Sequence, residues 1–338
     1  MPETISAIGE FGLIKKVRAI IDSEGVRPEG LTLGAGDDAA SFLPRPGYDI
    51  LVTCDAFIEG RHYLPGVIAG YDLGRRAMTA NISDIGAMGG APRYALVSLG
   101  LRGETAVSEV EGLYRGFLAG LNPLCACIIG GNVAESDFTF IDITLIGEIR
   151  QGMAVRRSGA RPGDAVLLTG STGRAAGGLQ LLRSRPGDAG LSDNPLVRAY
   201  IAPSHRALLG QAAAATGYVT AMIDTSDGLA GDLAHICEES GAGADLFLEA
   251  IPLDEGLLEA ARAFGLDPYG LVLGMSDDYE LIMTCDPRRA QELQGIAAQQ
   301  GVPLTVIGTI TDSREINLVA PGGVKRRLDY AGWDHFRR

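Results

Sequence analysis

Five aspartates stand beside glycine-rich or small-residue stretches, at positions that the sequence predicts as strand ends. They are Asp38, Asp55, Asp84, Asp224 and Asp227. Carboxylates that lie close together repel one another unless a cation sits between or beside them. A hard cation such as Mg²⁺ takes oxygen ligands and usually brings phosphates with it. The pattern therefore predicts one shared metal–phosphate cleft, and the alternative is a set of unrelated turn and helix-capping aspartates.

Phosphoryl transfer is the chemistry that such a cleft serves. It asks for in-line positioning and for neutralisation of the charge on the transferred group. In open α/β architectures ligands bind at the carboxyl ends of strands, so we expect carboxylates from both halves of the chain to meet and to hold more than one Mg²⁺ against a nucleotide. We identify no Ser-His-Asp or Cys-His arrangement, and the four histidines include no His-x-x-x-His pair, which argues against zinc.

Two further stretches carry weaker signals. Gly170-Ser171-Thr172-Gly173 stands between a predicted strand and a predicted helix, an order that can present helix amides to a phosphate. It lacks the Gly-Lys-Ser/Thr ending of a Walker A loop. Cys125 and Cys127 do not have zinc spacing, and five cysteines in a long chain argue against a disulfide framework, so we interpret this pair as buried small residues.

The elements that must position these residues follow from hydrophobic periodicity. Helices are predicted at 10–21, 72–81, 107–121, 174–182, 195–217 with a break at Pro203, 229–239, 257–264 and 287–300. Strands are predicted at 48–54, 94–101, 138–149, 165–169, 221–223, 245–251, 279–285 and 304–310, and another strand ends near Gly130. This mixture indicates an α/β (α+β) protein.

Length and composition indicate an ordinary globular protein with two domains. The chain has 338 residues, of which 46% are hydrophobic and 21% charged, and its net charge is −13. That charge argues against a nucleic-acid or anionic-membrane surface. No signal-peptide pattern and no long apolar run is present, so a cytoplasmic location is expected. The turn-rich, basic stretch at 156–164 suggests domains at 1–150 and 151–338.

Eight motifs, in this order and spacing, resemble the thiamine-monophosphate kinase family over nearly the whole chain. The motifs are Glu10-Phe11 with Ile14; Gly-x-Gly-Asp-Asp at 34–38; Asp55 with Glu59-Gly60-x-His62; Asn81-x-Ser83-Asp84 with Ala87-Met88-Gly89; Arg157-Ser158-Gly159-Ala160 with Pro162-Gly163-Asp164; Asp224-x-Ser226-Asp227-Gly228-Leu229; Asp278-Tyr279-Glu280-Leu281; and Gly332-Trp333-Asp334-His335-Phe336. Single motifs are shared with aminoimidazole ribonucleotide synthetase and selenophosphate synthetase.

The resemblance implies a fold and a reaction. The fold is a two-domain aminoimidazole ribonucleotide synthetase-like one, in which domain 1–150 binds ATP and Mg²⁺ and forms a dimeric β-barrel with its counterpart. Domain 151–338 is an α/β sandwich that closes the cleft. The reaction is transfer of a phosphoryl group from ATP to thiamine monophosphate, giving thiamine diphosphate, in a homodimeric enzyme.

The resemblance also implies roles for individual residues. Mg²⁺ positions fall on Asp38, Thr53, Cys54, Asp55, Asp84, Asn132, Asp224 and Asp227, of which Asp38, Asp55, Asp84 and Asp224 are the catalytic set. ATP-contacting positions fall on Gly131, Asn132, Arg157 and Ser226, and substrate-contacting positions on His62, Asp277 and Trp333. Trp333 can stack on the cationic thiazolium, and Asp277 can pair with that charge. The alternatives are a hydrophobic plug for Trp333 and a surface-loop histidine for His62.

Three departures from the family pattern leave the acceptor and the turnover open. The family usually has Gly-Gly-Asp, Gly-Gly-Glu and Ser-Thr where this chain has Gly130-Gly131-Asn132, Met275-Ser276-Asp277 and Thr53-Cys54. Losing one charge-stabilising group typically costs about 10²–10³ in rate. The chain is therefore a working kinase with altered metal use, a kinase with another acceptor such as α-ribazole, or a nucleotide-binding protein without turnover.

Overall fold

The computed structural model describes residues 2–328 and divides them into two compact units. The first unit comprises residues up to 85 together with 90–152, and the second comprises 86–89 together with the chain from 153 onward. No helix within 2–328 is both long and apolar enough to cross a membrane.

In the described residues, the first unit is built around a four-stranded sheet with the strand order β3-β6-β4-β5. Its strands are β3 (Tyr48–Ile58), β4 (Ala91–Leu101), β5 (Cys127–Glu135) and β6 (Phe140–Arg150). β6 pairs antiparallel with both β3 and β4, whereas β4 and β5 run parallel. β3, β4 and β5 therefore run in the same direction and end at one edge of the sheet, whereas β6 ends at the opposite edge.

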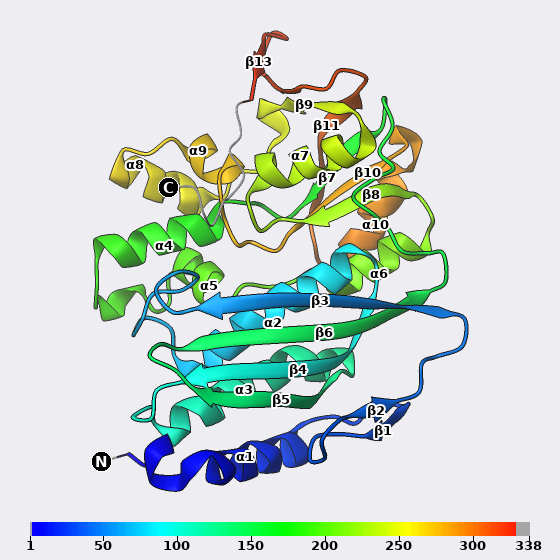
Figure 1. Cartoon of the computed structure of the whole chain (residues 1–338). Helices are drawn as coiled ribbons and strands as arrows, with labels where there is room; N and C mark the ends of the chain where they lie inside the picture. The colour runs from blue at the N-terminus through cyan, green and yellow to red at the C-terminus, as the bar shows by residue number, and fades with distance from the viewer. Residues whose placement is uncertain (1, 329–338) are drawn as a thin grey trace. The chain divides into compact units, whose positions relative to one another are not determined.

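One face of this sheet is covered by helices and the other is open. On β6, Ile141, Ile143 and Leu145 are fully buried, and they alternate with more exposed residues as the two-residue period of a strand requires. α2 (Gly70–Ala87) and α3 (Val107–Leu121) lie on the buried face, behind the sheet in Figure 1. The open face leaves Val52 63% and Leu96 37% exposed. A further helix, α1 (Ile5–Glu24), packs against α3.

α2 and α3 approach each other closely because glycines line their contact. A Cβ atom on Gly74 would lie 2.1 Å from the carbonyl oxygen of Leu113. A Cβ atom on Gly116 would lie 2.0 Å from the carbonyl oxygen of Tyr71. Neither position has room for a side chain, so the glycines allow the two backbones to touch. This contact holds in place the helix that carries Asp84.

The Gly-x-Gly-Asp-Asp stretch forms the loop between two short antiparallel strands. These strands are β1 (Leu31–Leu33) and β2 (Ser41–Phe42). Within the loop, Gly36 has a φ of +133°, and the guanidinium of Arg18 lies where its Cβ would be. Asp38 is exposed in this loop. The residue therefore lies in a hairpin-like connection and not at an end of the main sheet.

In the described residues, the second unit is built around a seven-stranded mixed sheet with the order β13-β12-β9-β11-β7-β10-β8. The strands are β7 (Ala165–Thr169), β8 (Val219–Asp224), β9 (Gly243–Phe247), β10 (Leu281–Cys285), β11 (Leu304–Thr311), β12 (Ile316–Val319) and β13 (Lys325–Arg327). On β7, Val166 and Leu168 belong to one hydrophobic core and Leu167 to another. A continuous apolar run is typical of a strand that is buried on both faces.

Helices cover both faces of this second sheet. One core contains residues of α4 (Arg174–Ser184), α5 (Pro195–Ile201), α7 (Leu229–Ser240), α8 (Glu255–Phe264) and α9 (Pro268–Leu273). The other contains residues of α6 (Ala207–Ala215) and α10 (Ala290–Gln299). The predicted α/β (α+β) class and the layered C-terminal half are confirmed.

Three boundaries differ from the predicted ones in ways that move candidate site residues. β3 continues to Ile58 because it pairs with β6 along its whole length, so Asp55 lies inside a strand. α2 continues to Ala87, so Asp84 lies inside a helix and does not cap one. β5 passes through Asn132 and ends at Glu135, because it continues to pair with β4.

Two predicted strands of the second half are shorter than expected. The strand predicted at 245–251 ends at Phe247 and is followed by a short turn of 3₁₀ helix. The strand predicted at 279–285 begins at Leu281. Tyr279 has a φ of +52°, a left-handed conformation that a strand does not contain. The segment before Leu281 is thus an irregular loop.

Candidate functional site

Asp55 and Asp84 meet on the buried side of the first sheet. Asp55 projects from β3 and Asp84 from α2, and the two carboxyl groups are hydrogen-bonded to each other. Thr53, two residues before Asp55 and on the same face of β3, donates a 2.5 Å hydrogen bond from its Oγ1 to Oδ2 of Asp84. These three predicted site residues therefore form one cluster.

The electrostatics of this cluster fit a bound cation. Burial, together with the charge and hydrogen bond of Asp84, raises the pKa of Asp55 to about 7. Two carboxyl groups this close share a proton or a positive ion. Within 2–328, no group of three or more His, Cys, Asp or Glu side chains is arranged to hold a metal by itself. Mg²⁺ does not need such a cage, because it commonly takes one or two carboxylates and completes its shell with phosphate and water oxygens.

Cys54 and Asn132 lie on the opposite, open face of the same sheet. Cys54 directly precedes Asp55 on β3. Asn132 belongs to the cross-strand row Ala56–Asp142–Ser98–Asn132, which is the next row after that of Asp55. Side chains of successive residues point to opposite faces. The structure therefore does not bring Cys54 or Asn132 to the Asp55–Asp84 pair.

Asp142 is a carboxylate on this open face that the sequence reasoning missed. Its Oδ1 accepts a 3.4 Å hydrogen bond from the Cys54 thiol, and Thr144 donates to the same sulfur at 3.6 Å. The charge of Asp142 also contributes to the raised pKa of Asp55. No glycine-rich stretch flags Asp142, since it sits in the middle of an alternating strand.

Gly131 belongs to the same cross-strand level as Asp55. The row runs from Asp55 through Ile143 and Val97 to Gly131. A Cβ atom on Gly131 would lie 1.9 Å from the carbonyl oxygen of Val97, so the position has no room for a side chain. The glycine allows the backbones of β5 and β4 to lie close together here. Asp38 is not among the charges that raise the pKa of Asp55, and it lies on its own exposed loop.

Hydrogen bonds of His62 and Glu59 help to hold the loop after β3. His62 accepts a 3.0 Å hydrogen bond at Nδ1 from the backbone N–H of Ile58. Glu59 accepts from both terminal nitrogens of Arg102, at 2.8 and 3.1 Å, and from the backbone N–H of Thr139 at 2.8 Å. These hydrogen bonds, with that from Arg102 the largest, lower the pKa of Glu59 to about 2. The motif Glu59-Gly60-x-His62 thus shapes the loop through Glu59.

In the second unit, Asp224, Ser226 and Asp227 lie at the end of β8 and in the loop before α7. Asp224 is buried at the last position of the strand. The backbone N–H groups of Ser226 and Asp227 both donate to Oδ2 of Asp232, at 3.0 and 3.2 Å. Burial, followed by the charges of Asp224 and Asp227, raises the pKa of Asp232 to about 8. Asp232 is a further carboxylate that the sequence reasoning did not single out.

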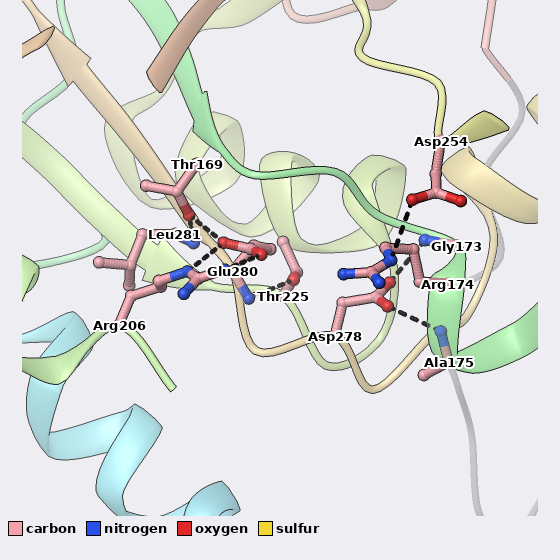
Figure 2. A network of polar contacts seen from close by, with 10 residues as sticks. All are labelled: Thr169, Gly173, Arg174, Ala175, Arg206, Thr225, Asp254, Asp278, Glu280 and Leu281. Carbon is pink, nitrogen blue, oxygen red and sulfur yellow. Dashed lines mark hydrogen bonds and ion pairs between the residues drawn. The ribbon is translucent and has the colours of Figure 1, made fainter. Parts of the chain in front are cut away.

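The amides at the start of α4 are already occupied by side chains of the protein. Asp278 accepts from the backbone N–H groups of Gly173 at 2.5 Å and Ala175 at 2.8 Å, and Ser276 Oγ accepts from Ala176 at 3.1 Å. Figure 2 shows Asp278 directed at the start of this helix. The possibility that Gly170-Ser171-Thr172-Gly173 presents these amides to a phosphate is therefore wrong, because side chains of the chain itself accept from them.

Three further predicted residues are Arg157, Asp277 and Trp333. Arg157 is exposed, and its carbonyl oxygen accepts a hydrogen bond from Ser240 Oγ. Asp277 is half-buried in the loop that precedes β10. Trp333 lies outside the described residues.

Comparison with known proteins relates this arrangement to one family. Residues 36–149 match the model of the N-terminal domain of AIR synthase related protein, and residues 161–320 match that of its C-terminal domain. Thiamine-monophosphate kinase of Salmonella typhimurium (strain LT2) is 32% identical over 334 residues, which cover 98% of this chain and 99% of that protein. The chain belongs to the thiamine-monophosphate kinase family of AIR synthase related proteins. The resemblance expected from the motifs is confirmed.

Solved structures of this family share the fold. Thiamine-monophosphate kinase from Stenotrophomonas maltophilia K279a is 30% identical, with a TM-score of 0.80 over 92% of this chain and 96% of that one. AaThiL complexed with AMPPCP and TMP is 27% identical, with a TM-score of 0.77 over 97% of each chain. The hydrogenase maturation protein HypE of E. coli has the same fold at 18% identity, with a TM-score of 0.77 over 95% of this chain and 98% of that one.

Proposed function

We propose that the protein transfers the γ-phosphoryl group of ATP to thiamine monophosphate and so produces thiamine diphosphate. The observation that carries this proposal is the full-length match to thiamine-monophosphate kinases, which includes every element that holds a candidate site residue. The structure of the related AaThiL contains AMPPCP and TMP, and the fold of that protein corresponds to nearly all of this chain.

The residues of this chain fit Mg²⁺ as the metal of the reaction. When bound, Mg²⁺ would neutralise the phosphate oxygens around which charge develops in the transition state. Asp55 and Asp84 would hold it, because their close approach and burial require a positive partner. The corresponding ligands of the second unit would be Asp224 and Asp227. Asp38, in its loop of the first unit, would be an additional ligand. Thr53 orients Asp84 through its hydroxyl hydrogen bond. Resemblance alone assigns Cys54 and Asn132 to metal binding, and their side chains lie on the face opposite the Asp55–Asp84 pair.

The other site residues bind and orient the two substrates. We assign Gly131, Asn132, Arg157 and Ser226 to ATP, and His62, Asp277 and Trp333 to thiamine monophosphate. A phosphate oxygen of the acceptor is already anionic, so the protein need not remove a proton from it. The task of the side chains is to align acceptor and donor in line and to keep competing water away.

The proposal extends to the domains and to the assembly. Domain 1–150 would carry the ATP and Mg²⁺ site and the dimer contact, and domain 151–338 would close over the acceptor. The open, partly apolar face of the first sheet supports a homodimer, because two such faces can bury each other. The dimeric β-barrel would then consist of one open sheet from each copy.

The test is release of ADP from Mg²⁺-ATP with and without thiamine monophosphate, together with detection of thiamine diphosphate. We expect ADP release that depends on the acceptor and equals the amount of thiamine diphosphate formed. Tight ATP binding with no product would contradict the proposal. Screening other heterocyclic acceptors, such as α-ribazole, would then identify a kinase of different specificity.

Asn132 supports a second candidate, a nucleotide-binding protein without turnover. A neutral amide stands where the family usually has a carboxylate, and the structure puts this residue on the face away from Asp55. Asn132→Asp separates the two candidates. A gain in turnover of about 10²-fold would indicate a kinase that has lost a charge. A loss of turnover would indicate a site adapted to the amide, with the missing charge supplied elsewhere.

A further inference from the structure

Glu280 is a buried carboxylate that connects several segments of the second unit. Arg206 donates to both of its oxygens, from Nε to Oε2 and from Nη2 to Oε1, each at 2.6 Å. Thr169 at the end of β7 donates to Oε2 at 2.5 Å, and its own Oγ1 accepts from the backbone N–H of Leu281 at 2.7 Å. Figure 2 shows Arg206 and Thr169 converging on Glu280 from different elements.

The backbone of Glu280 is joined to the loop that follows β8. The N–H of Thr225 donates to the carbonyl of Glu280 at 2.8 Å, and the N–H of Tyr279 donates to the carbonyl of Thr225 at 2.9 Å. Thr225 Oγ1 also accepts from the N–H of Glu280 at 3.0 Å. Thr225 stands between Asp224 and Ser226, two of the proposed metal- and ATP-binding residues. Moving Glu280 would therefore move this loop.

A second contact between the same two loops leaves no space between them. Gly228 has a φ of +101°, and a Cβ atom there would lie 2.1 Å from the carbonyl oxygen of Gly274. Residues 224–228, here called the donor loop, thus pack directly against residues 274–279, here called the acceptor loop.

The acceptor loop is also held at its other side. Asp278 and Ser276 bind the first amides of α4, as described above. The left-handed Tyr279 reverses the chain between Asp278 and Glu280, so that one carboxylate reaches α4 and the other reaches Arg206. Asp277, the proposed acceptor-binding residue, lies next to one of these anchors. Its position depends on both.

We propose that the Arg206–Glu280 ion pair is a positioning device that holds the donor and acceptor loops in one fixed arrangement. Stability alone does not require such a pair, because apolar residues of similar volume usually replace a buried ion pair at little cost. A bidentate arginine fork fixes orientation as well as distance. Both residues line a cavity of about 310 Å³, so the pair borders open space and is not sealed in the core. The coupling of the loops is independent of the proposed function, whereas its effect on catalysis rests on that function.

Hydrogen exchange measured by mass spectrometry on the full chain tests the coupling. The variant is Arg206→Met/Glu280→Leu, which keeps the volume and removes the fork. The control is Lys325→Met/Asp245→Leu, which removes another ion pair of the same sheet. In that pair, Nζ of Lys325 lies 2.6 Å from Oδ2 of the buried Asp245. We expect amides of both loops to exchange about 10-fold faster in the variant and at the wild-type rate in the control. Unchanged protection of the donor loop would overturn the proposal.

Steady-state kinetics on the same proteins test the catalytic effect. We expect kcat to fall about 100-fold, the cost typical of a small misplacement of reacting groups, with the KM for ATP and the KM for the acceptor both raised, because both loops lose their anchor. Arg206→Lys, which keeps the charge without the fork, should recover part of kcat. A loss that only follows the folded fraction would overturn the positioning role. If the wild type does not phosphorylate thiamine monophosphate, the proposed function fails, and the exchange experiment still decides the coupling.

Discussion

Asp55 and Asp84 are two carboxyl groups in a half-buried place where both cannot be charged without a positive partner. The sequence predicted both as site residues from their small-residue surroundings. It could not predict that Thr53 donates to Asp84, because that contact joins a strand residue to a helix residue 31 positions later. Asp142 and Asp232 escaped prediction for a similar reason, since nothing local distinguishes them from ordinary strand and helix residues.

Replacing one carboxylate of this pair should weaken the metal site. Asp55→Asn keeps the size of the side chain but removes the charge that attracts the cation. We expect Mn²⁺ to bind about 10-fold more weakly in a calorimetric titration, and phosphoryl transfer to fall by about 10²–10³. Asp142→Asn is the matched control, because Asp142 lies on the other face of the sheet. If the control weakened Mn²⁺ binding more than Asp55→Asn does, the metal would bind on the open face of the sheet.

Glu59 gives a pH-dependent contribution to stability. Its pKa falls from 4.5 to about 2 on folding, mainly because Arg102 donates to it. A lowered pKa stabilises the folded state above the unfolded-state pKa, and that contribution is lost as the pH falls towards 2. In urea unfolding, Glu59→Gln should therefore cost about 1 kcal/mol at pH 7. The difference from wild type should shrink between pH 4.5 and 2. A difference that stays constant over this range would contradict this origin.

At the level of helices and strands, periodicity identified most elements and misplaced several of their ends. Helix 107–121 and strand 165–169 have the predicted bounds, since each is a clear apolar pattern with polar flanks. β3 runs four residues beyond its predicted end, because its pairing with β6 continues through polar residues. The occupied start of α4 could not be foreseen, since its caps come from Ser276 and Asp278, about a hundred residues later.

Two glycine-to-alanine changes, one at the contact between α2 and α3 and one in α10, should have opposite effects on stability. Gly116→Ala puts a methyl group against the carbonyl of Tyr71 and should lower the free energy of unfolding by about 1–3 kcal/mol. Gly295→Ala in α10 meets no atom within 4 Å and should raise it by up to about 1 kcal/mol. Urea unfolding of both variants gives the comparison. Equal effects would mean that the helices can move apart without cost.

For the whole molecule, the resemblance to a known family predicted more of the fold and function than the residue patterns did. Composition and element order indicated a two-domain α/β protein, and the motif order indicated the family. Neither could show that the first sheet is largely antiparallel, nor that its register puts Asn132 on the face opposite Asp55. Register depends on long-range pairing, and a shift of one residue would exchange the two faces.

The open face of the first sheet should carry the contact of the proposed homodimer. Val52 is 63% exposed on that face, and Val324 is 68% exposed in the second unit. Val52→Lys should convert the dimer to monomers in sedimentation equilibrium, because two lysines would have to be buried at the contact. Val324→Lys adds the same charge elsewhere and should leave the dimer intact. A monomeric wild type, or a dimeric Val52→Lys, would argue against this contact.

The pairing of β3 with β6 affects how the chain folds during synthesis. Tyr48 pairs with Arg150, and within the described sheet β6 is the one neighbour of β3. At about 5–20 residues per second, the ribosome needs roughly 5–20 seconds to make the intervening hundred or so residues. Throughout that time β3 has an unpaired edge and an apolar surface, the features of an aggregation-prone segment. A nascent chain arrested before β6 should therefore require a chaperone, whereas one released after residue 152 can complete its sheet.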